Sequence, residues 1–365
     1  MDHVFEINLE RFWKENKESL QKPFSTNKPR VAVNLPFDNH WLIGEMKVPS
    51  TVRYFSDPDY AEKINAKCND RMEAEIGIRP FGEHFSRVVP KRIEEVFGCR
   101  FELTEGGTPW LESDVKSIDD LKKIMKDVEK LDLEKFVLPD EWYADCERLE
   151  REFNIKISLG KSSRGPATIG TSVCGTMNLL LFLIDYPEVM DDFYTLLGEK
   201  MIEYYTLLRE KTGYTKRGFA FNDDNCSLFS PELYERFCYP VMERVFQHFA
   251  PVEGDLRHQH SDSDMGHLLL LLNSLGINST NFGPTVLSKF IREKMPRAMI
   301  SGQIPPMLLR NGTPEEIIEA VRSDIEDVGS DGGLVISTAG SIAEGTTLYN
   351  VKVLMYAVEK YGRYK

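Results

Sequence analysis

From residue 155 onward, short apolar segments alternate with longer helical patterns, and this alternation constrains the fold more than any other feature of the sequence. Short apolar strands that alternate with helices predict crossover connections and a parallel sheet. Seven segments are expected to be strands: residues 31–36, 155–160, 218–223, 255–260, 276–282, 298–302 and 332–338. Seven successive strands favour a closed barrel over an open sheet, so we expect an α/β fold of the (β/α)8 TIM-barrel type.

The remaining segments are expected to surround this barrel. Residues 1–30 indicate an N-terminal helical extension that ends in a polar linker. Residues 80–150 indicate a lid-like insertion with a hairpin that turns at Gly106-Gly107 and a helix capped by Ser117. The chain has 365 residues, within the range of roughly 200 to 400 that such a barrel occupies as one domain. We therefore expect a single domain over residues 1–365.

Charge and cysteine usage narrow the possible partners. The formal net charge of -13 repels phosphate backbones, so nucleic acid is a poor partner. The six cysteines form no C-x-x-C pair, which is typical of a reduced cytoplasmic protein. The longest apolar stretch, residues 177–184, is far shorter than the roughly 20 residues that a membrane span needs. We expect a cytoplasmic protein that acts on a small molecule.

In a parallel barrel the active site lies at the carboxyl ends of the strands, so the residues that end each strand matter most. Several polar groups occur at these positions in register along the sequence. Three of the seven histidines fall within residues 257–267, which is the strongest concentration in the chain.

His258 and His260 form the sharpest motif, because alternate residues of a strand point to the same side. Both imidazoles can therefore converge on one ion or one substrate group. With Asp262 as the carboxylate they would form a zinc-like site with an open position, although Asp224 could take the same place. The alternative is that one histidine packs in the barrel wall while the other hydrogen-bonds an aspartate.

Asp223 and Asp224 are adjacent at the end of the strand over residues 218–223. Two neighbouring acids repel each other, and burial would raise the pKa of one of them, which suits a general acid. We therefore expect Asp223, Asp224 and His260 to be catalytic residues. The alternative is that one aspartate only caps the following turn.

Four further residues are expected to contact the substrate: Arg164, Asn225, Asn281 and Gln303. The guanidinium of Arg164 could form two hydrogen bonds to a substrate carboxylate, but a surface ion pair is an equally good interpretation. Cys226 lies beside the aspartates and is expected to be a small buried apolar residue.

Taken together, residues 222–365 resemble the uroporphyrinogen decarboxylase superfamily. The resemblance rests on the order and spacing of several short segments: Phe229-Ser230-Pro231-Glu232, His258-Gln259-His260, Ser301-Gly302-Gln303-Ile304-Pro305, Gly312-Thr313-Pro314-Glu315 and Gly332-Gly333-Leu334-Val335. It implies a (β/α)8 barrel and one of two chemistries, the metal-free decarboxylation of a porphyrinogen or methyl transfer involving a corrinoid protein. The decarboxylases carry an arginine-rich segment near the N-terminus, whereas residues 33–40 of this chain contain no arginine, so porphyrinogen decarboxylation is disfavoured.

The thiol-methylating branch of this superfamily has H-x-C where this chain has His258-Gln259-His260, and a second cysteine near the position of Gly340. Neither cysteine is present here. The resemblance therefore favours the related O-demethylase methyltransferases, which hold zinc with acids and histidine. It implies a methyltransferase that moves a methyl group from a small methoxylated or methylated substrate to a corrinoid protein, assisted by zinc, and it is consistent with a homodimer. A metal-free lyase that decarboxylates a smaller acid is the alternative, and a barrel that only binds a tetrapyrrole or corrinoid is a third.

Overall fold

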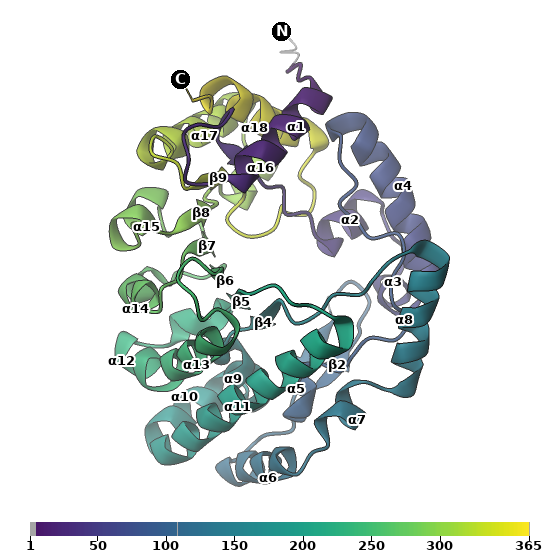
Figure 1. Ribbon diagram of the computed structural model, residues 1–365, viewed down its shortest axis with the longest axis vertical. Helices are drawn as coiled ribbons and strands as arrows, with labels where there is room; N and C mark the ends of the chain where they lie inside the picture. Colours follow the sequence, from purple (N-terminus) through teal and green to yellow (C-terminus); the bar gives the residue numbers. More distant parts are fainter. Residues whose placement is uncertain (1–4, 108, 365) are drawn as a thin grey trace.

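A parallel sheet of seven strands, in the order β1-β9-β8-β7-β6-β5-β4, forms the centre of the computed structural model, which describes residues 5–107 and 109–364. The strands are β1 (Ala32–Val33), β4 (Ser162–Arg164), β5 (Phe219–Asn222), β6 (Arg257–Ser261), β7 (Ser279–Phe282), β8 (Met299–Ser301) and β9 (Leu334–Ile336). Helices follow the strands and lie outside the sheet, while α4 and α8 lie on the opposite side of the molecule (Figure 1). The fold is the expected α/β barrel of the (β/α)8 type.

Six of the seven expected strand segments contain a strand, but the prediction for residues 155–160 was wrong. Pairing with β5 begins only where the amide of Ala220 donates to the carbonyl oxygen of Lys161, so the strand is β4, residues 162–164. The preceding segment runs alongside helix α11, where the amide of Leu159 donates to Thr212 and Arg209 donates to the carbonyl of Gly160. Arg164 consequently ends a strand rather than standing in the loop after it.

The sheet has two free edges. Within the described residues, β4 pairs only with β5 and β1 pairs only with β9, so no strand joins the two ends. The chain between them contains the antiparallel hairpin of β2 (Arg100–Glu102) and β3 (Trp110–Glu112), with Gly106 in its turn as expected. The outer edge of β4 thus remains open to side chains from neighbouring helices.

The first half of the chain is mainly helical. Its helices are α1 (Leu9–Gln21), α2 (Asn39–Glu45), α3 (Thr51–Ser56), α4 (Pro58–Ile76), α5 (Ile93–Val96), α6 (Ile118–Glu129), α7 (Leu133–Val137) and α8 (Asp140–Phe153). Ser117 caps α6 in a capping box with Asp120, as expected. Helix α8 has no counterpart among the expected elements. Its buried Trp142 belongs to the same apolar core as the barrel, so the insertion is packed against the barrel.

The second half supplies the outer helices of the barrel. They are α9 (Pro166–Cys174), α10 (Thr176–Asp185), α11 (Pro187–Thr212), α12 (Pro231–Leu233), α13 (Tyr239–Phe249), α14 (Leu269–Ser274), α15 (Ser288–Lys294), α16 (Pro306–Asn311), α17 (Pro314–Val328) and α18 (Leu348–Tyr361). Short helical turns cover η1 (Asp224–Leu228), η2 (Tyr234–Cys238) and η3 (Gly266–Leu268). Across the described chain no single helix is long and apolar enough to cross a membrane, but the bent pair α9 and α10, with 103° between them, passes the same test of length and composition.

Candidate active site at the carboxyl ends of the strands

A row of polar side chains crosses four neighbouring strands at the level of their carboxyl ends. Arg164, Asn222, His260 and Asn281 are successive register partners on β4, β5, β6 and β7. Phe221 packs edge-to-face against Phe246 of α13 outside the sheet, so its neighbour Asn222 and the whole row point to the barrel interior. Barrel interiors are usually filled with branched apolar residues. A polar row in this place marks the candidate site.

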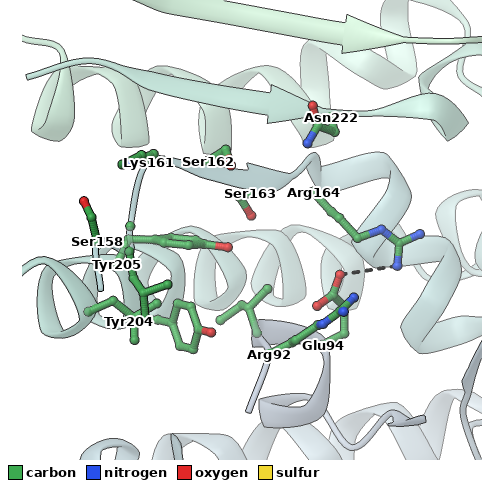
Figure 2. A pocket seen from close by; sticks show the side chains of 14 residues that line it. Arg92, Glu94, Ser158, Lys161, Ser162, Ser163, Arg164, Tyr204, Tyr205 and Asn222 are labelled. Carbon is green, nitrogen blue, oxygen red and sulfur yellow. Dashed lines mark hydrogen bonds and ion pairs between the residues drawn. The ribbon is translucent and has the colours of Figure 1, made fainter. Parts of the chain in front are cut away.

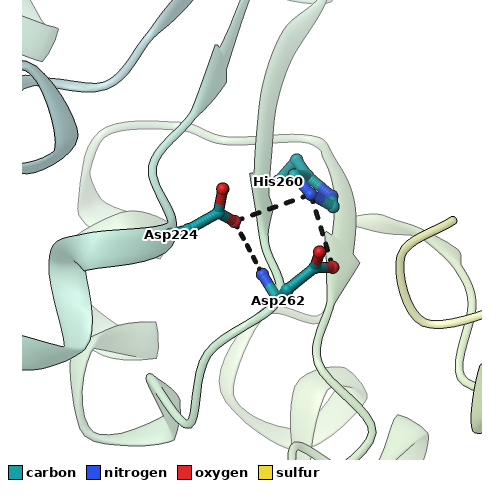
Figure 3. Close-up of side chains that lie close together, drawn as sticks. All are labelled: Asp224, His260 and Asp262. Atoms are coloured by element: carbon teal, nitrogen blue, oxygen red, sulfur yellow. Dashed lines mark hydrogen bonds and ion pairs between the residues drawn. The ribbon is translucent and has the colours of Figure 1, made fainter. Parts of the chain in front are cut away.

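Asp224, His260 and Asp262 form a compact cluster beside this row (Figure 3). Nε2 of His260 lies 3.6 Å from Oδ1 of Asp224 and 3.4 Å from Oδ1 of Asp262. The backbone N–H of Asp262 also donates to Asp224 Oδ1 at 2.9 Å, which fixes the two loops relative to each other. The three residues come from η1, from β6 and from the loop after β6.

The amide of Asn281 determines which nitrogen of His260 carries a proton. Its Nδ2 group donates to the carbonyl oxygens of Ser301 and Thr338, the latter at 3.0 Å. Its Oδ1 therefore faces Nδ1 of His260 at 2.8 Å and accepts the N–H of Gly340 at 3.1 Å. Because this oxygen can only accept, Nδ1 of His260 must donate, and in the neutral ring Nε2 presents its lone pair to the two carboxylates.

A lone pair that faces two carboxylate oxygens is unfavourable unless a proton or a cation lies between them. The ligand atoms of Asp224, His260 and Asp262 all lie within 4.8 Å of one another. A tetrahedral zinc ion with bonds of about 2.1 Å separates its ligands by roughly 3.4 Å, close to the two distances from Nε2. The donor set and its spacing therefore fit a divalent metal with one nitrogen and two oxygen ligands.

Asp262 occupies the space next to Gly340, where the resemblance places a second cysteine ligand. A Cβ built on Gly340 would lie only 2.2 Å from Oδ1 of Asp262, and Gly340 has a φ of +89°. The glycine thus leaves room for the carboxylate. Burial raises the pKa of Asp262, and the nearby acids Asp224 and Asp38 raise it further, while His260 opposes them.

His258 lies one step deeper in the barrel than the cluster. Its Nδ1 is 2.9 Å from the hydroxyl of Ser279, its register partner on β7. Burial, and secondarily the charge of His260, lower the pKa of His258 to about 4, so its ring stays neutral. The group that the structure assembles is Asp224, His260 and Asp262, which differs from the expected ligand set of His258, His260 and Asp262.

The two adjacent aspartates point in different directions. Asp223 is fully buried, and its Oδ1 accepts the backbone N–H of Thr168 in the first turn of α9 at 2.8 Å. Burial raises the pKa of Asp223 to about 6, although the N–H donors of α9 oppose this. A Cβ on Gly165 would lie 2.2 Å from Asp223 Cβ, so this glycine lets the carboxylate reach the helix. Asp223 holds α9 in place, and only Asp224 faces the cluster.

Two expected substrate contacts are engaged in holding loops. The amide of Asn225 donates to the hydroxyl of Thr171 on α9. The buried side chain of Gln303 donates to the carbonyl oxygens of Gly283 and Val286, at 3.0 and 2.7 Å. Both side chains support the β5–α12 and β7–α15 connections, whereas Asn281 contacts the cluster directly through His260.

Sequence reasoning gave no separate role to Asn222, which is exposed and lies between Arg164 and His260 in the row. The sequence did indicate its orientation, because Asn222 alternates with the outward Phe221 in the strand pattern Phe-Ala-Phe-Asn. Arg164 itself forms an ion pair with the buried Glu94, with 3.3 Å between Nη1 and Oε1, and the same nitrogen donates to Ser172 at 3.0 Å.

Comparison with known proteins gives both a family and a structural relative. Residues 49–361 match the family model described as Uroporphyrinogen decarboxylase (URO-D). Among solved structures, a methyltransferase from Methanosarcina mazei superposes with a TM-score of 0.67 at 15% sequence identity, covering 94% of this chain and 97% of that one. A search of curated protein sequences gave no match.

Proposed function

The chain belongs to the uroporphyrinogen decarboxylase family, and from this premise we propose that it is a methyltransferase that moves a methyl group from a small methoxylated or methylated molecule to a corrinoid protein. The structural likeness to the methyltransferase from Methanosarcina mazei supports this choice within the family. The observation that carries the proposal is the cluster of Asp224, His260 and Asp262 at the carboxyl ends of the strands.

We propose that this cluster holds one zinc ion. Asn281 fixes the histidine tautomer that leaves Nε2 free to act as a ligand, and hydrogen bonding of the second nitrogen is the usual support of a metal-bound imidazole. Three protein ligands leave one position open, as in catalytic zinc sites. When bound, zinc would supply the Lewis acidity that polarises the oxygen or nitrogen from which the methyl group leaves.

The surrounding residues orient the ligands and the substrate. The N–H of Asp262 holds Asp224 toward His260, and Asp223 anchors α9 behind them. Asn222 is exposed beside His260, and its side-chain amide makes no hydrogen bond within residues 5–107 and 109–364, so it is available to a substrate polar group. The aspartate pair supplies no separate general acid in this arrangement, because Asp223 is fully buried and engaged with α9 and Asp224 is one of the proposed zinc ligands.

A polycarboxylate such as a porphyrinogen does not suit this site. Asp38, which follows β1 and caps α2, is close enough to raise the pKa of Asp262, so it adds a third acid to the same end of the barrel. Zinc would offset the charges of Asp224 and Asp262 but not that of Asp38, so the site offers no excess positive charge to a substrate that carries many carboxylates. The arginine-free segment over residues 33–40 offers no compensating cation.

Metal analysis combined with a methyl-transfer assay tests the proposal. Protein purified without chelators should contain about one zinc per chain, and His260→Ala should lose it. With free cobalamin in its reduced state as acceptor, methoxylated aromatic and aliphatic compounds should yield methylcobalamin, which is followed by its absorbance. Full activity in metal-free protein would contradict the zinc site. Release of carbon dioxide from a small acid with no methyl transfer would support the lyase instead.

A further inference from the structure

A cavity of about 410 Å³ runs along the open edge of β4, between that strand and helices α5 and α11 (Figure 2). We call it the β4-edge pocket. The residues that matter for its chemistry are Arg92, Glu94, Lys161, Ser163, Arg164 and Asn222. Its size falls within the range of about 300 to 1,000 Å³ that is typical of small-molecule sites.

The β4-edge pocket is positively charged in a strongly acidic protein. Three cationic residues, Arg92, Lys161 and Arg164, and one acid, Glu94, are among its lining residues, which leaves a net charge of +2. Arg164 pairs with Glu94, while Arg92 lies over the ring of Phe101 and Lys161 over the ring of Tyr214. The chain as a whole carries -13. The field of the whole protein would therefore repel anions from most of its surface, and this pocket is a place where an anionic group would be stabilised.

Arg164 is only partly used by its protein partners. Its Nη1 contacts both Glu94 and Ser172, while Nε and Nη2 have no partner in the described part of the chain. The side chain is 37% exposed. One edge of the guanidinium thus remains available for a carboxylate, which it can bind with two parallel hydrogen bonds.

The strand itself adds donors that have no partner. The hydroxyl of Ser163 is buried beside the phenol of Tyr205, and it makes no hydrogen bond of normal geometry to any described residue. The backbone groups of Lys161 and Gly165 bond to β5, so those of the alternate residues Ser162 and Arg164 point to the open edge. A buried hydroxyl that lacks a partner is costly unless a ligand or water satisfies it.

We propose that the β4-edge pocket binds the carboxylate end of the substrate, and this assignment rests on the proposed function. Asn222 lies between the β4-edge pocket and the cluster of Asp224, His260 and Asp262, because it lines the pocket and is the register partner of both Arg164 and His260. Neighbouring strands lie about 4.8 Å apart, which places Arg164 and His260 on the order of 10 Å from each other. The substrate class is a carboxylic acid whose methylated oxygen or nitrogen is separated from the carboxylate by a spacer of several atoms.

Equilibrium binding of a matched series of probes tests this assignment. Methoxyacetate, 4-methoxybutyrate and 6-methoxyhexanoate would be titrated by calorimetry in parallel with their carboxamides. The carboxylates of the longer probes should bind at least about tenfold more tightly than their carboxamides, since charge-assisted hydrogen bonds are lost in the amide. Equal affinity of acid and amide across the series would overturn the proposal.

Two variants test whether the preference for carboxylates over carboxamides arises in the β4-edge pocket. Lys161→Gln should reduce the preference for the carboxylate, whereas Lys123→Gln, which removes the same charge from the exposed face of α6, should preserve it. Ser163→Ala should weaken carboxylate binding without lowering the midpoint of thermal unfolding, because its hydroxyl makes no hydrogen bond of normal geometry in the described part of the chain. Loss of stability in Ser163→Ala with unchanged binding would show a purely structural role and contradict the assignment.

These measurements test the carboxylate pocket independently of the proposed methyltransferase function. Binding is measured without zinc or corrinoid, so a carboxylate preference that depends on Lys161 supports the pocket even if no methyl group is transferred. Methyl transfer that proceeds equally from acids and amides, and equally in Lys161→Gln, would sustain the proposed function and reject the pocket as its substrate site.

Discussion

Nδ1 of His260 lies 2.8 Å from Oδ1 of Asn281, and this contact sets the tautomer of the imidazole. The amide cannot turn over without breaking its bonds to the carbonyl oxygens of Ser301 and Thr338. A residue on β7 thereby decides that Nε2 of a residue on β6 presents its lone pair to Asp224 and Asp262. The metal site we propose depends on this orientation as much as on its ligands.

Replacing Asn281 should weaken zinc binding without removing a ligand. In Asn281→Ala the ring of His260 is free to turn, and we expect a loss of about 10- to 100-fold in zinc affinity, the usual effect of removing such a support. Competition with a chromophoric chelator measures it. Asn278→Ala is the matched control, because Asn278 bonds Arg257 and Asp255 at the opposite end of the strand. Equal zinc affinity in the two variants would contradict the role of Asn281.

The two histidines of β6 should differ in their effect on metal content. His260→Gln is expected to abolish zinc binding, whereas His258→Gln should retain about one zinc per chain, because the Nδ1 of His258 contacts Ser279 and its ring lies outside the cluster. Elemental analysis of both purified variants measures this directly. Loss of zinc from His258→Gln, in a protein that unfolds at the same temperature as the parent, would restore the ligand set predicted from the H-x-H motif.

Asp223 should make stability depend on pH. Folding raises the pKa of Asp223 from 3.8 to about 6, so the folded state holds this proton more tightly than the unfolded state. The resulting contribution to the free energy of unfolding is fully present below pH 3.8 and is lost as the pH rises through 6. The difference in unfolding free energy between the parent protein and Asp223→Asn should change by about 3 kcal/mol over this window and stay constant above it. Urea unfolding at several pH values measures the difference. Asp264→Asn, which removes an exposed acid from the β6 loop, is the control and should show no such change.

The sequence was sufficient to predict the order of strands and the end of the barrel that carries the polar residues, because apolar periodicity and strand alternation are local signals. It could not predict where β4 begins. Residues 155–160 have the composition of a strand, but their backbone bonds to α11, and that choice depends on a helix some 50 residues later. Arg164 was therefore expected in a loop.

The sequence was also insufficient to predict which residues form the cluster of Asp224, His260 and Asp262. The H-x-H motif correctly indicates that His258 and His260 share one side of β6, but alternate residues of a strand also stand at different depths in a barrel. Asp224 was weighed as a ligand and either aspartate as a cap of the following turn, and only the tertiary contact between Asp223 and Thr168 separates the two residues. Asn222 was given no separate role because its importance comes from its neighbours on two other strands.

Gly340 offers the sharpest test of the space that Asp262 occupies. A Cβ at this position would lie 2.2 Å from Asp262 Oδ1, so Gly340→Ala should displace the carboxylate and lower zinc affinity. Gly106→Ala is the matched control: its φ of +75° carries a similar backbone cost, about 1 to 2 kcal/mol, but its Cβ would have no atom of the other described residues within 4 Å. Both variants should lose stability in chemical unfolding, while only Gly340→Ala should lose zinc affinity in the chelator competition. If Gly340→Ala binds zinc as tightly as Gly106→Ala, Asp262 is not held in the ligand position by this glycine, and the carboxylate does not replace the cysteine of the thiol-methylating branch.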